Sequence, residues 1–305
     1  VEKAQVIRQK AIEMRYSPNI NARALAGQTT QVIGVLMDSK APGVFLQRAA
    51  AIERVAYRHG YRTMIGEAHD DVENFYTTYQ HMCQHGVDGI LFVSHDYPWK
   101  NQQIDLFFAN TGPMVFLGGP ERRGHSQVIL EVDSGIKQAV DHLRQRGRHN
   151  IILLSNTDSK YWSVKTREKG FVNAFPESEK GTILLFKQSD NLEEMRIHAR
   201  QLIHDVLIPG GIDAILTPND LVALLLQGEL LSAGLRIPED IALVGFDNEP
   251  FSACAQIPIT TIDQNNGSIA EYAIRMLLDI IQDQNSCHVA RKISVQPELV
   301  IRQTT

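Results

Sequence analysis

Residues 32–37 read VIGVLM and are followed by Asp38, and this stretch indicates the fold. A short continuous apolar run that ends at a polar residue is typical of a strand buried on both faces, as in a parallel sheet. Similar runs recur at residues 89–94, 150–154, 214–216 and 242–246. Segments with helical patterns separate them. This alternation predicts an α/β fold made of two doubly wound parallel-sheet subdomains.

The remaining elements follow from the same periodicities. Further strands are expected at residues 62–66, 113–117 and 181–186. Helices are expected at residues 45–60, 74–84, 104–110, 134–146, 165–174, 193–207 and 220–233. Each block of alternating elements spans about a hundred residues, which is an ordinary size for one subdomain.

Composition excludes several classes of protein. The chain has 305 residues, of which 43% are hydrophobic and 21% charged, as in folded soluble proteins. No apolar run approaches the roughly 18 residues that a membrane span needs, and the polar N-terminus does not resemble a signal peptide. We therefore expect a cytoplasmic protein with no membrane partner. The three cysteines are widely spaced and odd in number, which argues against a disulfide framework.

Charge is distributed unevenly along the chain. The net charge is −5, but residues 1–30 carry +3 and the remainder therefore carries −8. A basic end on an acidic body is typical of a protein that meets nucleic acid at that end. The first helix has Ile7, Ala11 and Met14 on one stripe, and Pro18 stops it. Asn19 is a suitable N-cap for a short second helix at residues 20–26, which a polar linker follows.

The carboxyl ends of the predicted strands identify candidate binding residues. Ligands of open parallel sheets bind in the crevice outside these ends. Polar side chains stand there at Ser39, Ser94, Asn219, Asp220 and Asp247. If the two sheets face one another, these side chains line one interdomain cleft. Their hydroxyl, amide and carboxylate groups suit a neutral polyhydroxyl ligand such as a sugar.

Patterns along nearly the whole chain resemble the LacI/GalR family of transcriptional regulators. Each is modest alone, and their order and spacing make the resemblance specific. They are Tyr16-Ser17-Pro18-Asn19 with Ala22-Arg23 and Leu25, Ile33-Gly34-Val35, Asp88-Gly89-Ile90-Leu91, His142-Leu143 with Arg146-Gly147, Arg167 with Gly170-Phe171, Asn219-Asp220, Ile237-Pro238-Glu239-Asp240, Val244-Gly245-Phe246-Asp247, Thr260-Thr261-Ile262 with Gln264, and Glu298-Leu299-Val300.

The resemblance implies a sensor core similar to periplasmic sugar-binding proteins, with three crossovers between subdomains. It divides the chain into a headpiece remnant with a hinge helix (1–31), an N-terminal subdomain (32–132 plus 264–288) and a C-terminal subdomain (133–263 plus 289–305). Ile7, Ala11 and Met14 match the third headpiece helix of the family. The first two helices of its helix-turn-helix are not in this sequence, so the major-groove recognition helix is not expected here.

The resemblance also assigns roles to candidate effector-binding residues. Arg167 would donate bidentate hydrogen bonds to effector hydroxyls or a carboxylate, whereas a lone arginine is otherwise a solvated charge. Asp247 would accept hydrogen bonds from hydroxyls, with a turn aspartate as the alternative. One of Asn219 and Asp220 would cap a helix while the other faces the cleft. The weaker candidates are Ser163 and Gln264, and the aromatics Phe45 and Trp99 could stack on a sugar or pack the rim.

In the hinge, Leu25 would wedge between base steps of the minor groove, with Ala22 beside it. Arg23 is either a phosphate contact or a solvated charge, and Asn19 caps the helix. The alternative role for Leu25 is that its side chain packs within a short helix and does not contact DNA. Two departures from the family loosen the effector assignment: Gly118 stands where some members have an aspartate, and Asn266 where an aromatic often stacks.

The sequence as a whole predicts a homodimeric DNA-binding transcriptional repressor. Its core is expected to bind a small effector and to couple effector binding to operator binding. A sugar or sugar acid is the first candidate for the effector, and a purine is the second. The alternative is the solute-binding protein of a sugar transporter. No phosphate loop, nucleophile elbow or metalloprotease motif is present, so we expect neither an enzyme nor a cofactor or metal.

Overall fold

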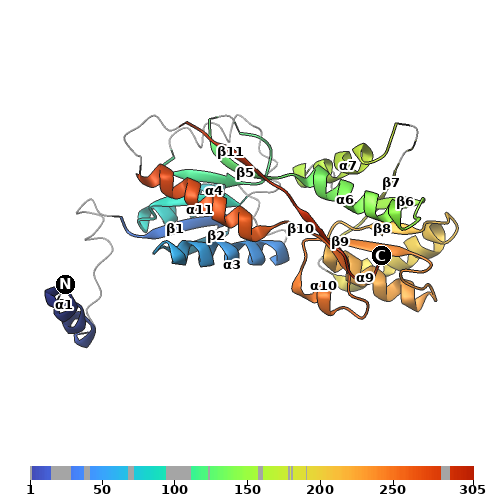
Figure 1. Ribbon diagram of the computed structural model, residues 1–305, viewed down its shortest axis with the longest axis horizontal. Helices are drawn as coiled ribbons and strands as arrows, with labels where there is room; N and C mark the ends of the chain where they lie inside the picture. Colours follow the sequence, from blue (N-terminus) through green and yellow to red (C-terminus); the bar gives the residue numbers. More distant parts are fainter. Residues whose placement is uncertain are drawn as a thin grey trace.

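The computed structural model describes residues 2–14, 29–37, 42–67, 72–93, 111–122, 124–156, 161–177, 179, 181–189, 191–282 and 289–305. These residues form two lobes joined side by side, with one helix standing apart from both (Figure 1). Several predicted site residues fall outside the described ranges, so their predictions stay untested: Ser39, Ser94, Trp99, Asn19, Ala22, Arg23 and Leu25.

The first lobe contains a six-stranded sheet in the order β11-β5-β4-β3-β1-β2, and every pairing in it is parallel. Its strands are β1 (Val32–Met37), β2 (Arg62–Glu67), β3 (Gly89–Val93), β4 (Met114–Leu117), β5 (Ser126–Leu130) and β11 (Lys292–Val295). Helices α3 (Pro42–Arg58) and α11 (Asn266–Gln282) cover one face and α4 (Val72–Gln84) the other. Both faces are therefore buried, which explains the continuous apolar strands.

The second lobe repeats this plan in the order β12-β10-β9-β8-β6-β7. Its strands are β6 (Ile151–Asn156), β7 (Thr182–Phe186), β8 (Ala214–Leu216), β9 (Ala242–Phe246), β10 (Thr260–Asp263) and β12 (Glu298–Val300), and only β12 is antiparallel to its neighbour among the pairings described. Helices α6 (Val132–Gln145) and α7 (Trp162–Asn173) cover one face. Helices α8 (Leu192–Leu202) and α9 (Asp220–Ser232) cover the other, a π-helical turn (Ile203–Leu207) extends α8, and the short α10 (Pro250–Cys254) follows β9. The predicted fold class is confirmed.

Three crossings connect the lobes, between β5 and α6, between β10 and α11, and between β11 and β12. The third crossing lies later in the chain than the boundary at residue 289 that was predicted from the sequence. Strand β11 pairs with β5 in the first sheet, Ser294 opposite Ile129, so residues 292–295 belong to the first lobe. The crossing itself lies between Val295 and Glu298, and it runs diagonally through the waist of the molecule (Figure 1).

The N-terminal helix α1 (Glu2–Glu13) lies apart from the lobes, and its apolar residues Val6 and Ile7 are exposed (Figure 1). Where the chain enters the first lobe, the Asp88 carboxylate accepts hydrogen bonds from the backbone N–H groups of Thr30 and Gln31, both at 2.8 Å. Gln31 has a φ of +61°, in the left-handed region, and the chain bends there. The two hydrogen bonds to Asp88, called the Asp88 clasp below, hold this bend. None of the described helices is long and apolar enough to cross a membrane.

Candidate functional site

A small hollow of about 20 Å³ lies where the two lobes meet. This is room for about one water molecule, so a sugar-sized ligand needs the lobes to separate. Residues of the first lobe, of the second lobe and of the crossings contribute to it: Arg48, Gly118, Val128, Leu130, Val132, Trp162, Ser163, Arg167, Gln264 and Ile269. The hollow opens at the carboxyl ends of β4 and β5, which is the edge that the sequence predicts for ligand binding.

Arg167 forms the second lobe's part of the wall. It projects from α7, and its guanidinium carbon lies 4.2 Å from the centre of the Phe246 ring, a cation–π contact. Its Nη2 lies 3.9 Å from Asp247 Oδ1, which is an ion pair but too long for a hydrogen bond. Its Nε is buried and has no hydrogen-bond partner among the described residues. Arg167 therefore retains donors that a ligand can use.

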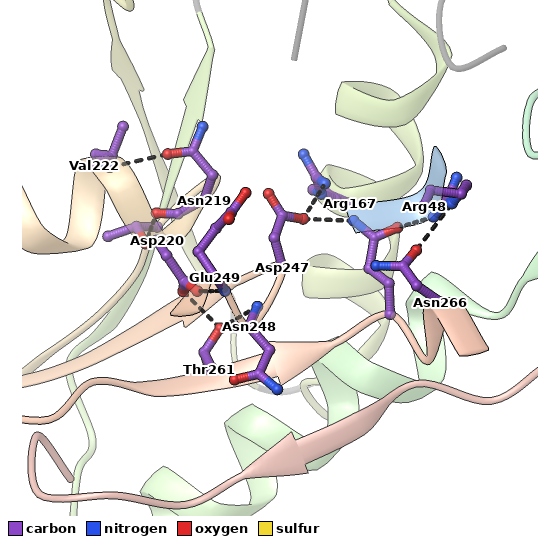
Figure 2. A network of polar contacts seen from close by, with 12 residues as sticks. Arg48, Arg167, Asn219, Asp220, Val222, Asp247, Asn248, Glu249, Thr261 and Asn266 are labelled. Carbon is purple, nitrogen blue, oxygen red and sulfur yellow. Dashed lines mark hydrogen bonds and ion pairs between the residues drawn. The ribbon is translucent and has the colours of Figure 1, made fainter. Parts of the chain in front are cut away.

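Asp247 directly follows β9, and its side chain points toward Arg167 (Figure 2). Burial raises the pKa of this carboxyl, and the nearby Arg167 opposes the shift. Gln264 Nε2 donates to Asp247 Oδ1 at 2.5 Å. Asp247 has a φ of +103°, a conformation that costs about 1–3 kcal/mol for a residue with a side chain and often marks a binding site. The backbone of Asp247 is held in this conformation, in which its carboxylate faces Arg167 and Gln264 between the lobes.

Arg48 forms the first lobe's part of the wall. It lies on the inner face of α3, and only 2% of its surface is exposed. Its Nε donates to Asn266 Oδ1 at 2.9 Å and its Nη2 donates to Gln264 Oε1 at 2.7 Å (Figure 2). Burial lowers the pKa of Arg48 to about 10, so the side chain still carries its charge at neutral pH. Gln264 thus joins Arg48 of one lobe to Asp247 of the other.

The other residues that line the hollow have mostly apolar side chains. Trp162, the half-buried first residue of α7, supplies a flat aromatic face, and Leu130, Val132 and Ile269 supply aliphatic surface. A few convergent polar groups in an apolar hollow are typical of a site that binds one small molecule in one orientation. In the described part of the chain no three His, Cys, Asp or Glu side chains gather as a metal would require.

The structure brings four of the predicted effector residues together: Ser163, Arg167 and Gln264 line the hollow, and Asp247 contacts two of them. Asp220 lies elsewhere. It is fully buried and accepts hydrogen bonds from Thr261 Oγ1 at 2.6 Å and from the backbone N–H of Glu249 at 2.7 Å (Figure 2). A Cβ at Gly245 would overlap its carboxylate, so the glycine makes room for it. The geometry gives Asp220 a structural role in place of the predicted ligand contact.

Asn219 and Phe45 also make structural contacts. The side chain of Asn219 caps α9, and its Oδ1 accepts from the backbone N–H of Val222 at 2.9 Å (Figure 2). A cap satisfies one of the free N–H groups of the first turn. Phe45 is 3% exposed and packs in the core of the first lobe, because α3 turns it toward the sheet. Neither residue lines the hollow.

Sequence reasoning missed Arg48 and Trp162 as site residues and treated Asn266 only as a missing aromatic. For Arg48 a signal was present. It lies four residues after Val44 and four before Ile52, so helical spacing places it on the apolar face of α3. An arginine on such a face must be buried with partners or reach a cavity.

Comparisons with known proteins agree with this architecture. The model of a periplasmic binding protein-like domain matches residues 140–305. The HTH-type transcriptional repressor PurR of Pasteurella multocida is 28% identical over 312 residues, covering 99% of this chain and 90% of that protein. PurR of Aliivibrio fischeri (strain ES114) is 29% identical over 299 residues, covering 96% of this chain and 86% of that protein.

Solved structures show the same fold. A lac repressor dimer bound to operator and the anti-inducer ONPF has a TM-score of 0.82 at 24% identity, covering 98% of this chain and 88% of that chain. A LacI regulator from Lactobacillus casei with bound Tris has a TM-score of 0.73 at 28% identity, covering 91% of this chain and 98% of that chain.

The buried Asp220 predicts a pH dependence of stability. Burial raises its pKa to about 7, against the hydrogen bonds from Thr261 and Glu249 that oppose the shift. A raised carboxyl pKa gives stability that is fully present below about pH 4 and is lost as the pH rises through 7. Asp220→Asn, which mimics the protonated form, should therefore gain about 3–4 kcal/mol relative to the parent between pH 4 and pH 8. Urea unfolding of both proteins across this range measures it; a difference that stays constant with pH would contradict the assignment.

Proposed function

Because the chain belongs to the family of periplasmic binding protein-like domains, in the form found in LacI/GalR regulators, we propose that it is the sensor core of a DNA-binding transcriptional repressor. The core binds a small polar effector between its lobes. One observation carries this proposal: Arg167 of the second lobe and Arg48 of the first line one hollow, and Gln264 of a crossing lies between them.

The effector class follows from the groups that reach the hollow. Arg167 offers donors, Asp247 offers acceptors and Gln264 offers both, which matches the two-way hydrogen bonding of neighbouring hydroxyls. Trp162 offers a flat face on which a sugar ring can lie. A sugar or sugar acid satisfies all of these groups. The same aromatic face also suits a planar nitrogenous ring such as a purine, which is the second candidate.

A role as the solute-binding protein of a transporter is the weaker alternative. It would use the same two lobes and the same hollow. The relatives that match 96–99% of this chain are named as transcriptional repressors, and the basic N-terminal segment with Ala22, Arg23 and Leu25 has no use in a transport protein. The assignment as a regulator also explains why we propose no catalytic role.

On the DNA side, we assign the hinge contacts to Asn19, Ala22, Arg23 and Leu25 on the strength of the family resemblance. Leu25 would wedge into the minor groove of operator DNA. What supports a signal between hinge and hollow is the clasp at Asp88, which fixes the backbone of Thr30 and Gln31 against β3. A rotation of the first lobe therefore carries Thr30 and Gln31 with it.

A homodimer is the proposed assembly, and exposed apolar residues on both lobes support it. Helix α9 reads DLVALLLQGELLS and leaves Leu221 45% exposed, and Phe251 of α10 and Leu46 of α3 are also exposed. Helices α3, α9 and α10 lie along the same lower edge in Figure 1. An interface that used these residues of both lobes would let a two-fold partner respond when the lobes move.

The effector site predicts the behaviour of two variants. Truncation of a buried charged partner costs about 2–5 kcal/mol of binding, and a ligand at about 100 times its Kd stabilises a protein by about 2.7 kcal/mol. Arg167→Ala and Asp247→Ala should therefore each remove most of the thermal stabilisation by the true effector. A thermal-shift screen of sugars, sugar acids and nucleobases identifies that compound. Arg236→Ala, an exposed arginine outside the hollow, is the control. A hit to which both variants respond normally would show that the ligand binds elsewhere.

The dimer surface predicts a change of assembly. Leu46→Glu combined with Leu221→Glu places a charge on each lobe's share of the surface, where burial of the charge without a partner is unfavourable. Sedimentation at micromolar concentration should show a dimer for the parent and a monomer for this variant. Ile197→Glu changes an equally apolar, 47% exposed residue on α8 and should stay dimeric. A dimer that survives the double change would place the interface elsewhere.

A further inference from the structure

Both charged side chains among the described residues that line the hollow are arginines. Arg48 enters from the first lobe and Arg167 from the second. The nearest described carboxylate, Asp247, is not part of the lining and reaches the hollow through its contacts with Arg167 and Gln264. Among the described lining residues, both charges are therefore positive, and one comes from each lobe.

The orientation of Arg48 is fixed before any ligand arrives. The amide oxygens of Asn266 and Gln264 hold two of its nitrogens at 2.9 and 2.7 Å. A guanidinium that is already ordered loses little entropy when it binds an anion. Asn266 begins α11, and Gln264 donates to Asp247, so each acceptor of Arg48 is itself positioned by a neighbouring contact.

Arg167 is complementary to this arrangement. It stacks over Phe246, it lies 3.9 Å from Asp247, and its buried Nε lacks a hydrogen-bond partner among the described residues. A buried donor without a hydrogen-bond acceptor destabilises the structure, and an acceptor on the ligand would remove this cost. In a hollow with apolar walls, two guanidinium groups attract an anion more strongly than they would in water.

We propose that the effector carries an acidic group, a carboxylate or a phosphate, which binds between Arg48 and Arg167, and that Arg48 determines this specificity. The proposal rests on the effector site described above and narrows its ligand. Neutral sugars lack the group that both arginines are placed to receive. Hydroxyls elsewhere on the same molecule would meet Gln264 and Asp247.

The test compares matched pairs of ligands by calorimetry and thermal shift: D-glucuronate with D-glucose, D-galacturonate with D-galactose, and D-gluconate with D-glucitol. Glucose 6-phosphate tests the phosphate form of the group. Inorganic phosphate and acetate, each against chloride at equal ionic strength, test the anion site without a sugar. The proteins are the parent chain, Arg48→Met, Asn266→Asp and the control Arg58→Met, which changes an exposed arginine on the same helix.

Acidic members should bind the parent at least about tenfold more tightly than their neutral counterparts. Arg48→Met preserves volume and should abolish that preference. Asn266→Asp keeps Arg48 but places a carboxylate on its Nε, so it should also weaken the acid, about tenfold. It is the second variant in case Arg48→Met does not fold, because an aspartate at the start of α11 favours the helix. Arg58→Met should bind as the parent does.

The outcomes separate the two proposals. Saturable stabilisation by inorganic phosphate or acetate that Arg48→Met removes supports the acidic-group site even if no sugar of the set binds. A neutral sugar that binds as tightly as its acid, and loses binding in Arg167→Ala, keeps the effector site and overturns the acidic-group proposal. Acid binding that is unchanged in both Arg48→Met and Asn266→Asp overturns it as well. If neither simple anions nor any acid of the set stabilises the parent, the proposal is also overturned.

Discussion

The burial of a charged guanidinium at the seam between the lobes is the constraint on which the site depends. Removing Arg48 from water costs several kcal/mol unless acceptors replace the solvent. Asn266 and Gln264 supply two of those acceptors, and both belong to the segment that crosses from β10 to α11. Gln264 also donates to Asp247 of the second lobe. One buried charge of the first lobe is therefore tied, through a single amide, to the acid of the second.

This arrangement makes the hollow sensitive to the relative position of the lobes. Two of the crossings supply its walls directly, Leu130 and Val132 flanking the first and Gln264 following β10 at the second. A ligand that bonds to Arg48 and Arg167 at once would favour one orientation of the lobes over others. Such differential binding is what allostery requires, with coupling energies of about 1–3 kcal/mol. Because the Asp88 carboxylate is hydrogen-bonded to the backbone of Thr30 and Gln31, these two residues would move with the first lobe.

The sequence predicted the parallel sheets because buried strands such as β1, β3 and β9 are continuous apolar runs. It did not predict β5, whose Ser126 and Gln127 interrupt the pattern although both are buried by pairing with neighbouring segments. Arg167, Asp247, Gln264 and Ser163 were predicted from strand ends and family resemblance. Asp220 could not be separated from a ligand residue, because only the fold shows that Gly245 leaves space for its carboxylate. Helical spacing on α3 indicates the direction of Arg48, but its partners Asn266 and Gln264 depend on how α3 packs against α11, which no local pattern encodes.

The most direct test of this account is a crystal structure of the chain with the compound that stabilises it most in the ligand screen. The account predicts that the compound lies between the lobes, within hydrogen-bond distance of Arg167 and of Gln264 or Asp247, with any acidic group between Arg48 and Arg167. A compound bound outside this hollow, or one that contacts a single lobe only, would contradict the claim that the effector is read at the seam.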